Sequence, residues 1–261
     1  GKLVVSLVFG NIDHVASGGP SGDSNWGELM TTLEEVQAAG GELKQVPVAG
    51  QPNVDLAHFT LKSGKKVDNA SFKDLVGLHS GRTGLTIPFA DKDDLEKQFG
   101  DRLFKKWIGV ERKVSVKTGS EAARDVAVQF MIYFGVESEG TPHHFAIKNS
   151  DVFLYNGHSQ IGFGPLDPRN FSASDFPSTY QILWIDGCVS YNYYEKDYFP
   201  LKAGGTKNLD MVTNGLESWV NESGPAMGRF VGAFIDGKQS SYKAILKAAQ
   251  FTDFGYDWGM D

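Results

Sequence analysis

The sequence DVFLYNGHSQIG, residues 151–162, is followed by QILWIDGCVSYNYY, residues 181–194, and the two segments follow the same plan. Each begins with a short, uninterrupted apolar run, which is typical of a strand buried on both faces. Each run then passes into a turn-prone dipeptide, Asn156-Gly157 in the first segment and Asp186-Gly187 in the second. We therefore predict two strands of a parallel sheet, each ending just before a chemically reactive side chain.

Other segments extend this pattern along the chain. Residues 3–9 form another unbroken apolar run, and a loop rich in Gly, Ser, Asn and Asp follows it. Asp23 or Ser24 can cap the amphipathic helix that comes next, and a further strand is expected at residues 43–48. This order predicts a βαβ unit with parallel strands and a right-handed crossover. Further strands are predicted at residues 127–136, 143–148 and 208–213, and a helical pattern covers residues 216–220.

The fold class predicted from these elements is α/β, with three α/β/α layers and a central, mostly parallel sheet. A chain of 261 residues is long enough for one large domain, and we assign residues 1–261 to a single one. Residues 50–125 are less regular, with scattered Pro and Gly and amphipathic stretches near residues 71–78 and 91–108. We expect this segment to be an insertion within the domain.

Composition excludes several classes of protein. Apolar residues make up 41% and charged residues 22%, which is ordinary for a folded globular chain and argues against disorder. A net charge of −7 without a dense Lys/Arg stripe argues against nucleic acid as a partner. The longest apolar runs are strand-sized, so no membrane span is expected. Cys188 is the one cysteine, which excludes an intramolecular disulfide and zinc sites built on paired thiolates.

His158 and Cys188 are the candidate catalytic residues. In an open parallel sheet, side chains that act on ligands collect beyond the carboxyl ends of the strands, and neighbouring strands would bring these two residues together there. A thiol attacks only as a thiolate, and an adjacent imidazole can take its proton, so the pair is suited to acyl transfer. A single cysteine is, however, commonly buried as a small apolar side chain, and this alternative stays open.

The surroundings of the dyad suggest further site residues. The backbone N–H groups of Ser159 and Cys188 follow sharp turns and are candidates for an oxyanion hole. Asp186 either binds a basic substrate side chain by a charge-assisted hydrogen bond or, as a residue at a strand end, caps the helix after Cys188. Asp13 lies in the loop after the first strand, which opens at the same edge of the sheet, and is a second candidate for substrate binding.

No metal or nucleotide site is predicted. His143 and His144 are adjacent in a predicted strand, so their side chains would point to opposite faces and would not share one ion. The short pattern Gly162-Phe163-Gly164 lacks the Lys-Ser/Thr that follows a phosphate-binding loop. We therefore expect no cofactor; structural calcium is not predicted.

The two quoted segments resemble the paired His and Cys blocks of the caspase-like (clan CD) cysteine peptidases, and the gingipain-type and metacaspase-type members are the most similar. The match covers residues 150–215, with a looser fit over residues 1–50. The resemblance implies a caspase-like fold, His158 as the general base or acid and Cys188 as the nucleophile. It also implies an acidic residue, Asp186, at the pocket for the residue before the scissile bond. No third catalytic residue can be named.

The expected function is therefore a cysteine endopeptidase that acts on peptides or proteins and cleaves after a basic residue. The family has glycine directly after the histidine, whereas this chain has Ser159, and this departure favours an alternative. In that alternative the chain is a catalytically inactive caspase-like scaffold with a binding or structural role. The gingipain-like resemblance also implies an extracytoplasmic, periplasmic or secreted protein. The oligomeric state cannot be inferred from the sequence.

Overall fold

The computed structural model describes residues 1–13, 19–117, 120, 122–194, 196–236 and 241–249 of the 261-residue chain. Its strands are β1 (Lys2–Asn11), β2 (Lys44–Val46), β3 (Phe59–Thr60), β4 (Lys66–Val67), β5 (Trp107–Val116), β6 (Arg124–Val136), β7 (Val152–Asn156), β8 (Gln181–Asp186) and β9 (Leu209–Thr213). Its α-helices are α1 (Ser24–Ala38), α2 (Phe72–Val76), α3 (Phe89–Leu103), α4 (Gly140–Asn149), α5 (Tyr191–Tyr194), α6 (Ser223–Ile235) and α7 (Tyr242–Ala249).

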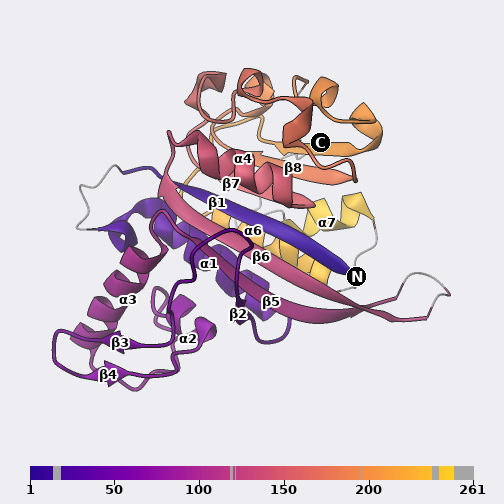
Figure 1. Ribbon diagram of the computed structural model, residues 1–261. Helices are drawn as coiled ribbons and strands as arrows, with labels where there is room; N and C mark the ends of the chain where they lie inside the picture. The colour runs from indigo at the N-terminus through magenta and orange to yellow at the C-terminus, as the bar shows by residue number, and fades with distance from the viewer. Residues whose placement is uncertain (14–18, 118–119, 121, 195, 237–240, 250–261) are drawn as a thin grey trace.

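One large sheet forms the centre of the described part of the molecule (Figure 1). It has seven strands in the order β2-β5-β6-β1-β7-β8-β9. The five strands from β6 to β9 run parallel to their neighbours in the sheet, whereas β5 and β2 add an antiparallel edge next to β6. The prediction of an α/β fold with a central, mostly parallel sheet is confirmed.

Helices cover both faces of this sheet and complete the three layers. The burial of neighbouring residues of β1 shows why residues 3–9 are apolar apart from Ser6. Val5, Leu7 and Phe9 are buried in a core shared with α1 and α6, whereas Val8 is buried in a second core shared with α4. A strand buried on both faces needs apolar residues at successive positions rather than at every second one. No helix within the described ranges is long and apolar enough to cross a lipid bilayer.

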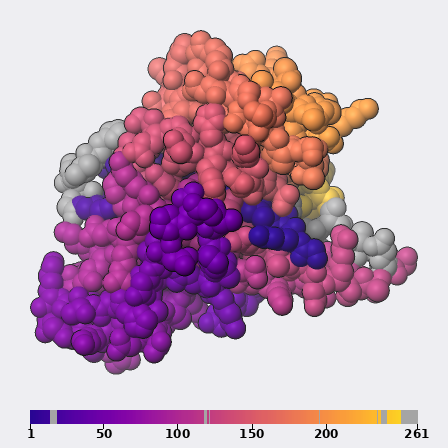
Figure 2. Space-filling model, viewed as in Figure 1, coloured from indigo at the N-terminus to yellow at the C-terminus, as the bar shows by residue number. Residues whose placement is uncertain are grey.

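The segment of residues 50–125 forms two separate parts of the structure, one at the side of the molecule and one in the central sheet. Its first part contains the β3–β4 hairpin, α2 and α3, and Figure 2 shows this purple part of the surface gathered at one side, away from the orange residues near 200. Its second part contains β5, which pairs along its length with β6 in the central sheet. The description of the whole segment as an insertion stays a prediction.

Two sequence-based assignments of strands differ from the structure in detail. The strand after α1 is not a neighbour of β1, because β2 lies at the far edge of the sheet, with β5 and β6 between them, and pairs antiparallel with β5. Since β5 is in turn antiparallel to β6, β2 still runs in the same direction as β1. Its polar residues Lys44 and Gln45 are exposed, as suits an edge strand. The segment of residues 143–148 belongs to helix α4 rather than to a strand. Its buried residues His143, Ala146 and Ile147 recur at the three- and four-residue spacing of a helix face.

Candidate active site

The pairing of β7 with β8 brings His158 and Cys188 to one edge of the sheet. The two strands are parallel neighbours, and Asn156 lies opposite Asp186 at their carboxyl ends. Each strand then continues through a single glycine to the reactive residue. The expected convergence of the two residues is therefore present in the structure. Their catalytic roles stay a prediction.

The two turns touch through their backbones. The backbone nitrogen of Gly157 donates a hydrogen bond to the carbonyl oxygen of Asp186, at 3.2 Å. A Cβ on Gly187 would lie 2.9 Å from the backbone nitrogen of Ser159 and 3.0 Å from the carbonyl oxygen of Gly157. Only glycine permits this approach at position 187, because the neighbouring atoms belong to the backbone and cannot rotate away.

The thiol of Cys188 is exposed, so this cysteine is not core filler. Its Sγ lies 3.9 Å from the carbonyl oxygen of Ser218. The next residue, Val189, has a φ of 55°, which is unusual for a β-branched residue, and its backbone nitrogen donates to the carbonyl oxygen of Leu216 at 2.9 Å. The cysteine therefore sits on a sharp turn that is bonded to the segment of residues 214–218.

A buried carboxylate, Glu137, orients the histidine. Its Oε2 lies 2.9 Å from Nδ1 of His158, and its Oε1 accepts a hydrogen bond from the backbone nitrogen of His158 at 2.6 Å. The Glu137 side chain is only 2% exposed, whereas that of His158 is 54% exposed. A carboxylate accepts hydrogen bonds only, so Nδ1 carries the hydrogen and Nε2 is the acceptor nitrogen of the neutral ring.

Glu137 is the site residue that the sequence reasoning missed. It directly follows β6, and β6 lies next to β1 in the parallel part of the sheet. The rule that selected His158 and Cys188, a polar residue just past a buried strand, also applies to Glu137. Gly10 at the end of β1 makes room for it, because a Cβ at that position would collide with the Glu137 side chain.

Two buried tyrosines support the turn that carries the histidine. The hydroxyl of Tyr155 donates to the carbonyl oxygen of His158 at 2.9 Å, and that of Tyr194 donates to the carbonyl oxygen of Ser159 at 2.6 Å. Burial raises the pKa of both phenols above their ordinary value, so they remain neutral donors. Ser159 is itself buried, and its backbone nitrogen faces the Gly187 turn.

Asp186 holds the loop beside the cysteine. Its side chain is buried, and Oδ1 accepts hydrogen bonds from Nδ2 of Asn214 at 2.5 Å and from Oγ of Ser218 at 2.6 Å. Residues 216–220 are not helical as the sequence suggested, because this segment is a loop between β9 and α6. Leu216 and Trp219 on this loop are both more than half exposed, so their helix-like spacing does not mark a buried face.

The other predicted acidic residue, Asp13, lies at the surface. Its Oδ2 accepts hydrogen bonds from the backbone nitrogen and the hydroxyl of Ser24, both at 2.6 Å. Asp23 is buried and is the N-cap of α1, as expected; it also accepts hydrogen bonds from the backbone nitrogens of Ile12 and Asp13. Burial raises the pKa of Asp23 above its usual value. The loop after β1 is thus fastened to the start of α1.

A small cavity opens on one side of the dyad. Its volume is about 100 Å³, and it extends from His158 and Cys188 toward the loop that carries Ser218 and Trp219. The lining is completed by Ile12, Asn25, Glu28, Asn156, Gly157, Val220 and Ser223. This volume is large enough for several water molecules or for one extended side chain. No lysine or arginine of the described residues lines it.

Glu28 supplies a buried carboxyl group to this cavity. The backbone nitrogens of Asn221 and Gly224 donate hydrogen bonds to its two oxygens, so α1 is tied to the start of α6. Burial raises the pKa of Glu28 above its usual value, and the negative charges of Asp186 and Glu222 act in the same direction. Glu28 is thus the acidic residue in the lining of this cavity, and Asp186, which is not part of the lining, lies close enough for its charge to act on Glu28.

A second cavity of about 300 Å³ lies on the histidine side of the dyad. It is lined by Glu137, His158, Ser159, Gln160, Ile161 and Cys188. Because His158 and Cys188 border both cavities, the dyad lies where the two meet. An extended chain placed across the thiol would therefore have space on each side of it.

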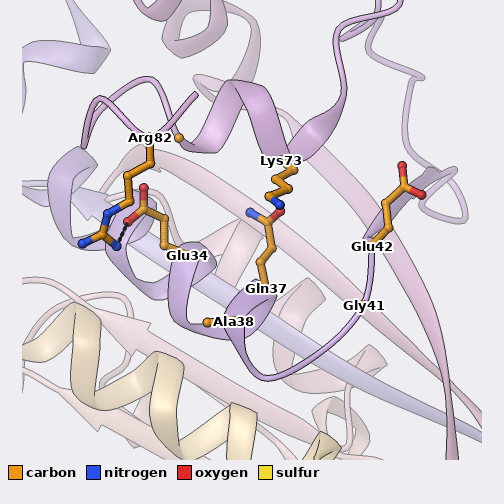
Figure 3. A pocket seen from close by; sticks show the side chains of 8 residues that line it. Glu34, Gln37, Ala38, Gly41, Glu42, Lys73 and Arg82 are labelled. Atoms are coloured by element: carbon orange, nitrogen blue, oxygen red, sulfur yellow. Dashed lines mark hydrogen bonds and ion pairs between the residues drawn. The ribbon is translucent and has the colours of Figure 1, made fainter. Parts of the chain in front are cut away.

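A third cavity, of about 500 Å³, lies away from the dyad between α1 and the segment around α2 (Figure 3). Figure 3 shows Arg82 paired with Glu34, at 3.3 Å, while the side chains of Lys73 and Gln37 point toward one another. The described lining of this cavity contains no thiol and no imidazole. We therefore place the candidate active site at the dyad.

The paired histidines do not form part of this site. His143 is buried in α4, where burial lowers its pKa to about 4, and His144 stacks on Phe171 and pairs with Asp175 at 3.3 Å. Across the residues that the structure describes, no cluster of three or more His, Cys, Asp or Glu side chains is arranged to hold a metal ion.

Comparisons with known proteins add no family: no protein-family model matches the sequence, and a search of curated proteins found no significant match.

Proposed function

We propose that this protein is a thiol-dependent endopeptidase of the caspase-like type, with Cys188 as the nucleophile and His158 as the acid and base. The observation that carries the proposal is the joint geometry of three groups. Cys188 is exposed on a sharp turn, that turn contacts the backbone of the histidine turn, and His158 is oriented by the buried Glu137. A nucleophile beside a base that is oriented by a third group is the arrangement required for covalent acyl transfer.

The reaction proceeds in two stages. His158 takes the thiol proton through Nε2, and the sulfur of Cys188 attacks the carbonyl carbon of the scissile peptide bond. The C–N bond then breaks while His158 gives the proton to the leaving amine, which leaves a thioester on Cys188. Water, deprotonated by the same imidazole, attacks the thioester; the new acid departs and the thiol is restored.

The oxyanion of each tetrahedral intermediate is proposed to bind the backbone N–H groups of Ser159 and Cys188. The close approach of the Gly187 turn to the nitrogen of Ser159 supports this assignment, because it brings the two turns that carry these donors together. Donors fixed in this way stabilise the developing charge without further rearrangement. Glu137 acts through His158 and is a positioning residue.

Cleavage after a basic residue is supported by the charges around the small cavity. Glu28 lines it, and Asp186 lies close enough for its charge to raise the pKa of Glu28. The positive charge of a substrate lysine or arginine would offset the electrostatic repulsion between the carboxylates of these two residues. Asp186 contributes to this preference through its negative charge and by holding Ser218, which lines the cavity, in place. It is not proposed to bind the substrate directly, because its Oδ1 already accepts hydrogen bonds from Ser218 and Asn214.

The proposal is tested by alkylation of Cys188 with iodoacetamide at neutral pH, together with a peptide-cleavage assay. The wild type is expected to react rapidly, and His158→Ala is expected to react at least about tenfold more slowly, because a neighbouring base raises the thiolate fraction. His79→Ala is the matched control, since His79 also pairs with a carboxylate, that of Glu96, but does not line either dyad cavity.

Peptide cleavage separates an enzyme from a scaffold. Cleavage that is lost in Cys188→Ala supports the proposal. Equal, slow alkylation of the wild type and His158→Ala, without peptide cleavage, would instead identify a caspase-like scaffold that has no turnover. Transfer of the acyl group to an added amine in preference to water would show a transferase that uses the same dyad, and product analysis by mass spectrometry distinguishes these outcomes.

A further inference from the structure

Ile161 has an unusual conformation next to the dyad. Its φ is 51° and its ψ is 33°, in the left-handed region that β-branched side chains disfavour, and the preceding Gln160 also has a φ of 51°. The side chain of Ile161 is not used in the core, because the residue is 66% exposed. An exposed apolar residue in a disfavoured conformation gains nothing from packing, and such positions cluster at functional sites.

Neighbouring contacts hold this segment in place. The side-chain nitrogen of Gln160 donates to Oε2 of Glu137 at 3.2 Å, so the segment is tied to the carboxylate that orients the histidine. Gly162, with a φ of 77°, packs close to Tyr193, since a Cβ there would lie 3.2 Å from the Tyr193 Cβ. Ile161 is therefore presented at a defined place beside His158, where it lines the 300 Å³ cavity.

The chemistry of peptide cleavage decides which part of a substrate would enter this cavity. The imidazole must lie between the thiol and the leaving nitrogen in order to protonate it. The residues on the leaving side of the scissile bond therefore pass over the histidine and not over the loop of Ser218 and Trp219. The 300 Å³ cavity is built almost wholly from the histidine side, by Glu137, His158 and the residues that follow it.

The lining also indicates the kind of side chain that fits. Ile161 provides the apolar side chain of this lining, and it is exposed. The one carboxylate in the lining, Glu137, is buried and already accepts hydrogen bonds from His158 and Gln160. A charged substrate side chain would find no unused partner in Glu137, whereas an apolar side chain would cover the exposed Ile161.

From these relationships we propose that the cavity beside Ile161 binds the side chain of the substrate residue directly after the scissile bond and selects an aliphatic or aromatic one. This subsite rests on the proposed peptidase function. It would make the enzyme selective on both sides of the bond, with an acidic pocket before it and an apolar pocket after it.

The test is cleavage of a peptide library that is randomised at every position, with the products sequenced by mass spectrometry. Leu, Ile, Val, Met and Phe are expected directly after the cleaved bond at least about tenfold more often than Gly, Asp and Glu, which is the selectivity typical of one apolar pocket. Two peptides that differ only by Leu or Gly at this position then give the ratio of their kcat/KM values.

Ile161→Gly is the decisive variant, because glycine adopts the left-handed conformation without penalty and the fold is retained. The Leu/Gly ratio is expected to fall to about 2 or less when the apolar wall is removed. Phe89→Ala is the matched control, since Phe89 is 77% exposed on α3 and lines neither dyad cavity. Its ratio should equal that of the wild type.

The outcomes are distinct. Cleavage without apolar enrichment after the bond, or an enrichment that survives in Ile161→Gly, overturns the subsite while the peptidase function stands. No cleavage of any library member by the wild type, together with slow alkylation of Cys188, overturns the peptidase function and the subsite with it.

Discussion

Glu137 binds His158 at two points, through the ring atom Nδ1 and through the backbone nitrogen, with distances of 2.9 and 2.6 Å. The double contact fixes both the rotation of the ring and the position of the chain that carries it. Because the carboxylate is buried, its charge is weakly screened and would stabilise an imidazolium formed in the proposed reaction. This pair is the observation that most favours the proposed role of His158 in proton transfer.

Glu137→Gln is expected to lower kcat/KM by roughly 10³-fold, because an amide cannot accept from both donors or balance the imidazolium charge. The pH dependence of Cys188 alkylation should change as well, which a purely structural role would not produce. Glu139→Gln is the matched control, since Glu139 lies two residues away and forms an exposed ion pair with Lys105. A Glu137→Gln variant with the wild-type rate and pH profile would show that the carboxylate does not assist the histidine.

Gly187→Ala should abolish the proposed peptidase activity. The new Cβ would meet the nitrogen of Ser159 and the carbonyl oxygen of Gly157 at about 3 Å, so the two turns must move apart. A loss of at least about 10²-fold in kcat is expected, comparable to the loss of an oxyanion-hole donor. Gly215→Ala provides the comparison, because a Cβ at that position meets nothing within 4 Å. Activity measured beside circular dichroism separates misplacement from unfolding; full activity in Gly187→Ala would contradict the proposed contact.

Trp219→Ala should weaken substrate binding more than chemistry. Trp219 is 59% exposed and lines the small cavity, so its indole would be covered by substrate. We expect KM to rise about tenfold with little change in kcat, the signature of binding energy shared by the ground and transition states. Leu216→Ala is the matched control, since Leu216 is 57% exposed on the same loop but does not line the cavity. Equal effects of the two substitutions on KM would argue against a substrate-binding role of the indole.

His143 should make the fold sensitive to acid. Burial lowers its pKa to about 4 from an ordinary value of 6.5, so between these pH values the unfolded chain binds a proton that the folded chain does not. The free energy of unfolding therefore decreases as pH falls from about 6.5 to about 4, and this one group contributes about 3 kcal/mol to the decrease.

His143→Leu removes the titrating group while keeping the site apolar. Between pH 7 and pH 4, the free energy of unfolding measured by urea denaturation is expected to fall by about 3 kcal/mol less in the variant than in the wild type. Parallel curves for the wild type and His143→Leu over this range would show that His143 is not the acid-sensitive group.

Local sequence patterns were sufficient to predict the two strands, β7 and β8, that lead to His158 and Cys188. The runs leading to His158 and Cys188 are apolar at successive positions, and only a strand covered on both faces requires that. The glycines at positions 157 and 187 likewise mark sharp turns from sequence alone. Weaker patterns led to an error at residues 143–148, which were predicted as a strand and belong to helix α4. In so short a segment, the apolar spacing of a helix face is easily mistaken for that of a strand.

What the sequence by itself determined is the two buried strands β7 and β8 and the turns and residues at their ends, because burial and turn formation depend on nearby residues, whereas the tertiary structure made these two strands parallel neighbours. Only the tertiary structure decided that Glu137 meets His158 and that Glu28 reaches the small cavity. It also decided that β2 lies at the antiparallel edge and that Ile161 borders a second cavity. These relationships join segments far apart in the chain, or depend on how one segment faces another, and no local periodicity records which strands and loops become neighbours once the sheet is assembled.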